Sequence, residues 1–164
     1  MPVLEIRLFP DPVLRECSKP AAWKDPKVHQ FIQSLIITLY DQPGGIGIAA
    51  PQVGITKRII LIDVSFKDPT KRLEIMINPK IIHSDGELLS REGCMSLPEY
   101  TANIKRSAQV TAQWTDPKGG LQQRRFSGIE AICLQHEIDH LNGKLFIDRV
   151  ASLKTEVFPR KRRK

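Results

Sequence analysis

The chain has 164 residues, of which 41% are hydrophobic and 26% are charged, so it is too apolar for a disordered protein and long enough for one domain with its own core. Residues 160–164 hold five of the 25 Lys and Arg residues, which leaves 20 against 18 Asp and Glu in the rest of a chain whose net charge is +7. This nearly neutral body argues against DNA binding, and the lack of an apolar run of about 18 residues argues against a membrane protein.

The first segment of the chain predicts a loop-rich entry, because residues 7–20 contain prolines and turn formers in irregular order. The N-terminal sequence MPVLEIRLFP has neither a basic start nor a sustained apolar stretch, so we expect no signal peptide and a cytoplasmic protein. A mature organellar form would have the same features. Three cysteines, Cys17, Cys94 and Cys133, are odd in number and far apart, which favours reduced thiols over a disulfide framework.

Residues 25–45 predict a long core helix. Asp25 is suited to cap its N-terminus, Pro26 to occupy its first turn, and Gly44 and Gly45 to follow its end. Apolar side chains recur at helical spacing at Val28, Phe31, Ile32, Leu35, Ile36 and Leu39.

The stretch GGIGIAAPQVG, residues 44–54, contains almost no side-chain volume, which lets its backbone run close to another element. It matches the dinucleotide pattern G-x-G-x-x-A, but a predicted helix precedes it and Pro51 follows it, whereas a Rossmann site needs a strand before and a helix after. Gln52 is either an ordinary loop residue or, beside a metal-activated water, a donor to a developing oxyanion.

Residues 57–126 predict a region rich in β-strands. The sequence DPKGG at 116–120 predicts a turn between the last two strands. The strand-like segments are residues 57–64, 74–82, 87–96, 103–114 and 121–127.

A second helix is predicted over residues 128–141. Ser127 and Glu130 have the spacing of a capping box, and Asn142 with Gly143 forms a stop signal. One stripe along this helix, which we expect to face the interior, contains Ile129, Ile132, Cys133, His136 and His140.

This helix contains the pattern H-E-x-x-H. Because residues four apart project side by side, His136 and His140 can bind one metal ion, with Glu137 beside it. The alternative is a pair of core histidines satisfied by hydrogen bonds. An apolar face keeps an imidazole neutral, and the neutral form is the one that binds metals, so the metal site is favoured.

A catalytic zinc-type site needs a third protein ligand. A zinc protease with this motif takes its third ligand from downstream, where the acidic candidates are Asp148 and Glu156. The upstream candidate is Cys94, which lies in a tight stretch between predicted strands. Cys133, on the same helix, is the competing thiol and is expected to pack as a small apolar residue. Glu92 is either a hydrogen-bonding support or a solvated charge.

Three stretches together resemble peptide deformylase: GIGIAAPQ (45–52, including Gly47), EGCMS (92–96) and QHEIDH (135–140), in the order and at the approximate separations of that family. The resemblance covers most of the chain and assigns residues 1–159 to a catalytic domain. It implies removal of the formyl group from the N-terminal formyl-methionine of newly made proteins. It also implies a compact single-domain α+β fold with antiparallel strands packed around a central metal-binding helix.

The resemblance implies that Cys94, His136 and His140 bind one divalent ion, with water as the fourth ligand. The family points to Fe(II), and the donor set also suits Zn, Co or Ni. Glu137 would take a proton from the attacking water and return it to the departing amine. The side chain of Gln52 and the backbone N–H of Met95 would hold the oxyanion.

By the same resemblance, the backbone of Gly47 would pair with the peptide substrate. The residues that would form the methionine pocket are Ile46, Ile129, Ile132 and Cys133.

Departures from the family pattern bear on substrate choice and on partners. Met95 stands where leucine is usual, and Thr101 stands where some members place an arginine near the substrate. Arg106 is either a partner of Asp139 behind the metal site or a surface charge. The basic tail at residues 160–164 is either solvated or an arm that contacts ribosomal RNA. The rival functions are a zinc protease and an RNA-binding module, and formylated nascent peptides are the expected partners.

Overall fold

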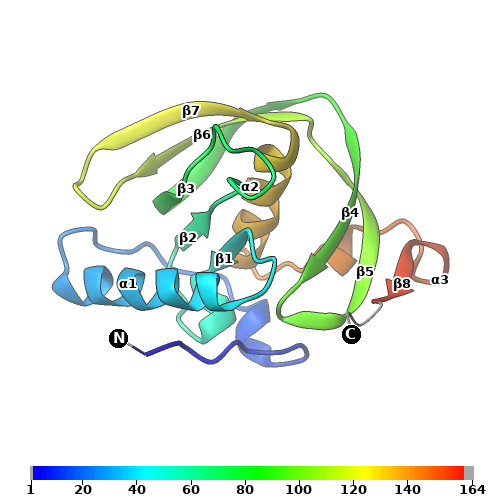
Figure 1. Ribbon diagram of the computed structural model, residues 1–164, viewed down its shortest axis with the longest axis horizontal. Helices are drawn as coiled ribbons and strands as arrows, with labels where there is room; N and C mark the ends of the chain where they lie inside the picture. The colour runs from blue at the N-terminus through cyan, green and yellow to red at the C-terminus, as the bar shows by residue number, and fades with distance from the viewer. Residues whose placement is uncertain (1, 161–164) are drawn as a thin grey trace.

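The structure is a computed structural model that describes residues 2–160 (Figure 1). Its helices are α1 (Pro26–Asp41), α2 (Gly128–Leu141) and α3 (Leu153–Glu156), with 3₁₀ turns η1 (Pro12–Arg15), η2 (Ala50–Val53) and η3 (Phe146–Arg149). Its strands are β1 (Gly47–Ala49), β2 (Ile59–Ile62), β3 (Glu74–Asp85), β4 (Leu88–Cys94), β5 (Leu97–Arg106), β6 (Gln109–Thr115), β7 (Leu121–Ser127) and β8 (Val157–Pro159).

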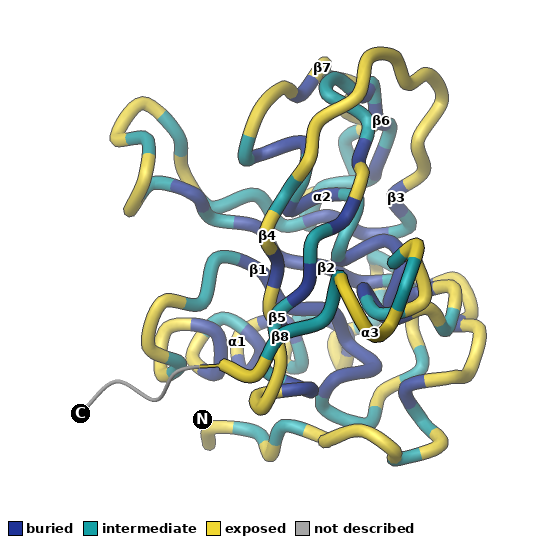
Figure 2. Tube along the Cα trace, turned by 90° about the vertical axis from the view of Figure 1, so that its right-hand side faces the viewer, coloured by how far each residue is buried: buried dark blue, intermediate teal, exposed yellow. Residues whose placement is uncertain are grey.

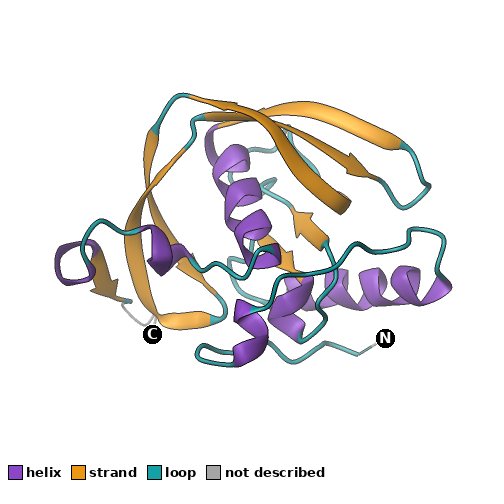
Figure 3. Ribbon diagram, turned by 180° about the vertical axis from the view of Figure 1, so that it is seen from behind, coloured by secondary structure: helices purple, strands orange, loops and turns teal. Residues whose placement is uncertain are grey.

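The strands form two antiparallel sheets around helix α2. One sheet has the order β1-β2-β3-β6-β7, and the other has the order β4-β5-β8. Helix α2 runs through the middle of the molecule between the two sheets, as the front and back views show (Figures 1 and 3). The expected α+β fold with a central helix among antiparallel strands is confirmed.

Helix α1 forms where the sequence predicts it. The Asp25 side chain accepts a hydrogen bond of 2.9 Å from the backbone N–H of Lys27, which satisfies one of the free donors at the helix start. The apolar face of the helix packs on strands β1 and β2, where Ile48, Ile59 and Leu61 are fully buried. This cluster supports the sheet from the side opposite α2.

Helix α2 spans the predicted residues, but its predicted capping box is wrong. Ser127 occupies the N-cap position without a side-chain hydrogen bond, and Glu130 instead forms a pair of hydrogen bonds of 2.9 and 3.0 Å with Arg124 of the preceding strand. A guanidinium that binds both carboxylate oxygens competes effectively with a single backbone N–H. The helix ends at Asn142 and Gly143, as expected.

The single strand predicted over residues 103–114 is two strands in different sheets. The chain leaves β5 at Arg106 and enters β6 at Gln109. Between them, the side chain of Gln135 accepts a hydrogen bond from the backbone N–H of Ser107 (3.0 Å) and donates one to its carbonyl (2.9 Å). Because these backbone groups bind helix α2, they are not part of a strand ladder, and the chain changes sheets there.

Strands β4 and β5 form a tight hairpin that delivers Cys94 to the interior. Strand β4 is mostly exposed near its start (Figure 2), and its last residue, Cys94, is buried. Cys94 pairs with Leu97 across a two-residue turn, and the register shifts between Gly93 and Cys94. The sequence pattern did not predict β8, which pairs with the outer side of β5.

Within residues 2–160, no helix has the length and apolar character needed to cross a lipid bilayer.

Gly143 fixes the end of α2 against the N-terminal segment. It has a φ of +72°, and a Cβ at this position would overlap the backbone carbonyl of Arg15. We predict that Gly143→Ala lowers the free energy of unfolding by about 1 kcal/mol for the left-handed backbone and by about 1–3 kcal/mol more for the overlap.

The matched control is Gly44→Ala, because Gly44 has a similar φ of +71° but no atom within 4 Å of the added Cβ. Urea unfolding of both variants measures the difference. Equal losses of stability would contradict the role of Gly143 in holding the helix end.

Candidate metal centre

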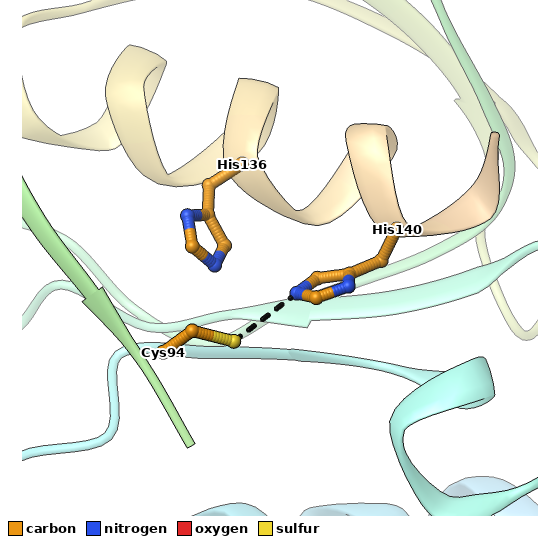
Figure 4. Close-up of side chains that lie close together, drawn as sticks. All are labelled: Cys94, His136 and His140. Carbon is orange, nitrogen blue, oxygen red and sulfur yellow. Dashed lines mark hydrogen bonds between the residues drawn. The ribbon is translucent and has the colours of Figure 1, made fainter. Parts of the chain in front are cut away.

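Cys94, His136 and His140 meet at one point. Each offers a ligand atom, and these atoms lie within 4.8 Å of one another (Figure 4). The Cys94 sulfur is 3.4 Å from Nε2 of His140. Metal–nitrogen and metal–sulfur bonds of about 2.1 and 2.3 Å at a tetrahedral ion place the two ligand atoms about 3.4–3.6 Å apart, in agreement with this distance. The predicted ligand set therefore fits a single cation.

Glu92 orients the first histidine of this set. Its Oε1 lies 2.9 Å from Nδ1 of His136, so Nε2 of that ring is left for the cation. Carboxylates commonly hold metal-binding histidines in this way and fix the tautomer. Of the two alternatives for Glu92, the structure supports the hydrogen-bonding support, since the side chain is buried.

Behind Glu92 lies a buried network of charges. Arg106, which is 4% exposed, donates to both oxygens of Glu92 (2.7 and 2.8 Å) and to Oδ2 of Asp139 (2.7 Å). Arg149 donates twice to the same aspartate, at 2.6 and 2.7 Å. The pairing of Arg106 with Asp139 is thus observed, whereas Arg149 was not predicted, because no local pattern connects η3 to the helix.

The network shifts the pKa values of the groups that face the cation site. Burial opposes the charged form of Glu92, but hydrogen bonds from Arg106 and His136 outweigh it and lower its pKa to about 2. Burial also opposes protonation of His136, yet hydrogen bonds to Cys94 and Glu92 raise its pKa well above the usual value. Burial lowers the pKa of His140. Because a metal ion binds the neutral imidazole, metal binding competes with protonation of His136.

Glu137 lies beside the ligands and forms no ion pair with another described residue. It is 3% exposed, and its Oε1 has no hydrogen-bond partner among the described residues. Burial raises its pKa to about 7. A Cβ on Gly47 would lie 2.6 Å from its other oxygen, which shows that the small residues of β1 do allow the predicted close approach.

Gln52 is held in a fixed orientation at the site. The side chain is 1% exposed, and its Oε1 accepts a hydrogen bond of 2.9 Å from the backbone N–H of Ala49. Its Nε2 therefore points at the Cys94 sulfur (3.4 Å) and the Ser96 hydroxyl (3.2 Å). Gln52 is therefore a buried amide donor next to the predicted ligand sulfur.

A cavity of about 640 Å³ opens onto these groups. It is lined by all the residues predicted to bind substrate or to act in catalysis: Ile46, Gly47, Gln52, Met95, Ile129, Ile132, Cys133 and Glu137. Ile129 and Ile132 are only half-buried, because their stripe of α2 faces this cavity instead of the packed core.

The competing ligands lie elsewhere. The Cys133 thiol donates to the carbonyl of Ile46 at 3.4 Å, and burial raises its pKa well above the usual value, so it remains a neutral thiol. Asp148 binds Arg15 and the backbone N–H of Leu145. Among the described residues, neither it nor Glu156 belongs to a cluster that could hold a metal ion.

Comparisons with known proteins agree with this geometry. The sequence model of the family described as Polypeptide deformylase matches residues 3–156. A peptide deformylase from Mesorhizobium japonicum is 41% identical over 165 residues, which cover 100% of this chain and 93% of the relative.

Solved structures show the same likeness. A peptide deformylase from Synechococcus elongatus in complex with actinonin superposes with a TM-score of 0.87 at 38% identity, covering 94% of this chain and 84% of the other. A Met-Ala-Ser-bound class I type b peptide deformylase from Acinetobacter baumannii has a TM-score of 0.83 at 29% identity, covering 91% of this chain and 99% of the other.

The contribution of Cys94 to the cation site can be measured directly. We predict that Cys94→Ser lowers the affinity for divalent metal ions by more than about 100-fold. Loss of a residue that only supports a ligand typically costs about 10–100-fold, and here a ligand itself is removed. Competition with a chromophoric chelator gives the affinity. Cys133→Ser is the matched control and retains the metal. Equal affinities of the two variants would exclude Cys94 as a ligand.

Proposed function

The chain belongs to the peptide deformylase family, whose members remove the N-formyl group from nascent peptides, and we propose that the residues around Cys94 perform this hydrolysis. The observation that carries the proposal is the convergence of Cys94, His136 and His140 on one point, with Glu137 beside them in the same cavity. A zinc protease with an acidic third ligand lacks support, since the acidic candidates lie outside this cluster.

We propose that Cys94, His136 and His140 hold one divalent ion, and that it is Fe(II), with Ni, Co or Zn also accepted. The donor set of one thiol and two imidazoles suits all four. When bound, the ion supplies Lewis-acid activation of the attacking water and of the formyl oxygen. Elemental analysis of protein purified without oxygen identifies the native metal.

Glu137 is proposed to move the proton. Its carboxylate takes a proton from the attacking water and delivers it to the nitrogen of the departing amine, so one residue acts as base and then as acid. Burial favours this exchange, because it raises the pKa of Glu137 to about 7 and so brings the two protonation states close in free energy. A bound cation nearby favours the charged form and lowers that pKa.

The developing negative charge on the formyl oxygen needs donors that are already in place. The Nε2 amide of Gln52 is fixed by the hydrogen bond that Ala49 donates to Oε1, and it points toward the ligand sulfur. The backbone N–H of Met95 comes from the residue directly after Cys94 in the hairpin turn. Fixed donors of this kind stabilise an oxyanion without reorganisation.

The cavity is proposed to bind the methionine side chain and the peptide backbone. Ile46, Ile129, Ile132 and Cys133 supply an apolar pocket next to Glu137. Gly47 lies in β1 at the edge of its sheet, where an extended peptide can add as a further strand. The Acinetobacter relative was solved with Met-Ala-Ser, the tripeptide that deformylation of formyl-Met-Ala-Ser releases.

We predict that Glu137→Ala retains the metal and lowers formate release from formyl-Met-Ala-Ser by about 10²–10⁴-fold, the usual contribution of a positioned acid–base group. The measurement uses protein purified without oxygen, with metal content determined on the same sample. Glu16→Ala, at an exposed position, is the control and keeps full activity. Turnover by Glu137→Ala at the rate of the control would rule out the proposed role.

The proposed partners are nascent peptides at the ribosome, and the proposed location is the cytoplasm. The proposal that the basic tail contacts ribosomal RNA concerns residues 160–164, of which 161–164 lie outside the described residues. Arg160 itself is described, and it lines the catalytic cavity.

We predict that deletion of residues 161–164 weakens co-sedimentation with ribosomes at low salt, because Lys and Arg contacts to phosphate depend strongly on salt concentration. Deformylation of a free tripeptide, assayed on the same preparation, controls for folding. Unchanged co-sedimentation would show that the tail does not contribute to ribosome binding.

A further inference from the structure

The mouth of the proposed catalytic cavity is lined by cations that form no ion pair with a carboxylate of residues 2–160. Lys67, Arg91 and Arg160 all contribute to its wall. Its only carboxylates among the described residues are Glu92 and Glu137, at the end that holds the metal ligands, and Glu92 is bound by Arg106 and His136. Lys67, Arg91 and Arg160 are exposed, whereas Glu92 and Glu137 are buried, so the positive charge lies on the solvent-facing part of the cavity wall.

Arg160 is brought to the cavity by the last strand. Strand β8 pairs with β5 through Pro159 and Tyr100 (Figure 2), and the backbone N–H of Arg160 continues this contact to the Glu99 carbonyl at 2.8 Å. Its guanidinium lies over the backbone of Gly93, because a Cβ added to Gly93 would be 3.5 Å from Nη1. Successive residues of a strand point to opposite faces, so this guanidinium lies on the exposed face of β4, where it lines the cavity.

Arg91 is held in place by neutral groups only. Its guanidinium lies 3.9 Å from the centre of the Phe158 ring, and its Nε donates a hydrogen bond of 3.0 Å to Thr101 Oγ1. None of the contacts of Arg91 or Arg160 within residues 2–160 is an ion pair with Asp or Glu. The Arg91 side chain is thus positioned, and the charges of both arginines remain available to a ligand.

We propose that this cationic mouth selects peptides that carry a carboxylate in the second or third residue, after formyl-methionine. The inference rests on the proposed function. If the formyl group of the substrate lies at the metal ligands, the rest of the substrate peptide leaves through the mouth. An extended peptide advances about 3.3–3.6 Å per residue, so its second and third side chains reach the region of Gly93 and Arg91. A nascent chain supplies such a carboxylate only from Asp or Glu side chains, because its C-terminus is esterified to tRNA.

The test compares kcat/KM for formate release by the full-length, metal-loaded protein on peptides with amidated C-termini. Formyl-Met-Glu-Ser-amide is compared with formyl-Met-Gln-Ser-amide, and formyl-Met-Ala-Glu-amide with formyl-Met-Ala-Gln-amide. At low salt we expect a preference of about 2–5-fold per cation for at least one glutamate peptide, which declines as salt screens the charges. Formyl-Met-Ala-Ser with a free C-terminus shows whether a terminal carboxylate is recognised in the same way.

The variants Arg160→Gln and Arg91→Gln assign the preference to residues. Each lowers the glutamate-to-glutamine ratio by about 2–5-fold, through KM, and the double variant abolishes it. Arg160→Lys and Arg91→Lys keep the ratio, which separates lost charge from lost structure. Arg125→Gln, on β7 and outside the cavity, is the matched control for loss of one arginine charge.

A ratio near one in the parent protein, or one that survives the double variant, overturns the inference while the deformylase assignment stands. Failure of the parent protein to release formate from any of these peptides instead overturns the proposed function, and this inference with it.

Discussion

The bidentate contact between Arg106 and Glu92 is the interaction on which the rest of the site depends. Arg106 comes from β5, and Glu92 from β4, and the same guanidinium reaches Asp139 on α2. These charges are buried, and breaking one member of such a group typically costs about 3–5 kcal/mol because its partner is left uncompensated. The network therefore fixes the position of the helix relative to the hairpin, and with it the distance between the Cys94 sulfur and the two imidazoles.

The second requirement is close approach of the backbone to the helix. Strand β1 can lie against Glu137 and Cys133 only because position 47 has no side chain. The same proximity removes water from the Glu137 carboxylate and raises its pKa. A sequence of small residues thus has an electrostatic consequence: it sets the proton affinity of the group proposed to carry the proton.

Local signals in the sequence were sufficient for α1, α2 and the H-E-x-x-H pair, but not for the short helix α3. The ends of α1 and α2 follow from caps and stops that lie within a few residues of each boundary. The capping box at Ser127 failed because Arg124, on a neighbouring strand, binds Glu130. The break after Arg106 was missed because Gln135, far along the chain, satisfies the backbone of Ser107. Strand β8 exists only through its pairing with β5.

The hairpin that joins β4 to β5 places two groups of the proposed mechanism next to each other in the chain. The Cys94 sulfur and the Met95 amide belong to adjacent residues, the last of β4 and the first of the two-residue turn. Because one peptide bond joins these two residues, a displacement of the hairpin carries the proposed metal ligand and the proposed oxyanion donor together. A change that shifts the hairpin relative to α2 therefore disturbs the proposed metal ligand and the proposed oxyanion donor at the same time.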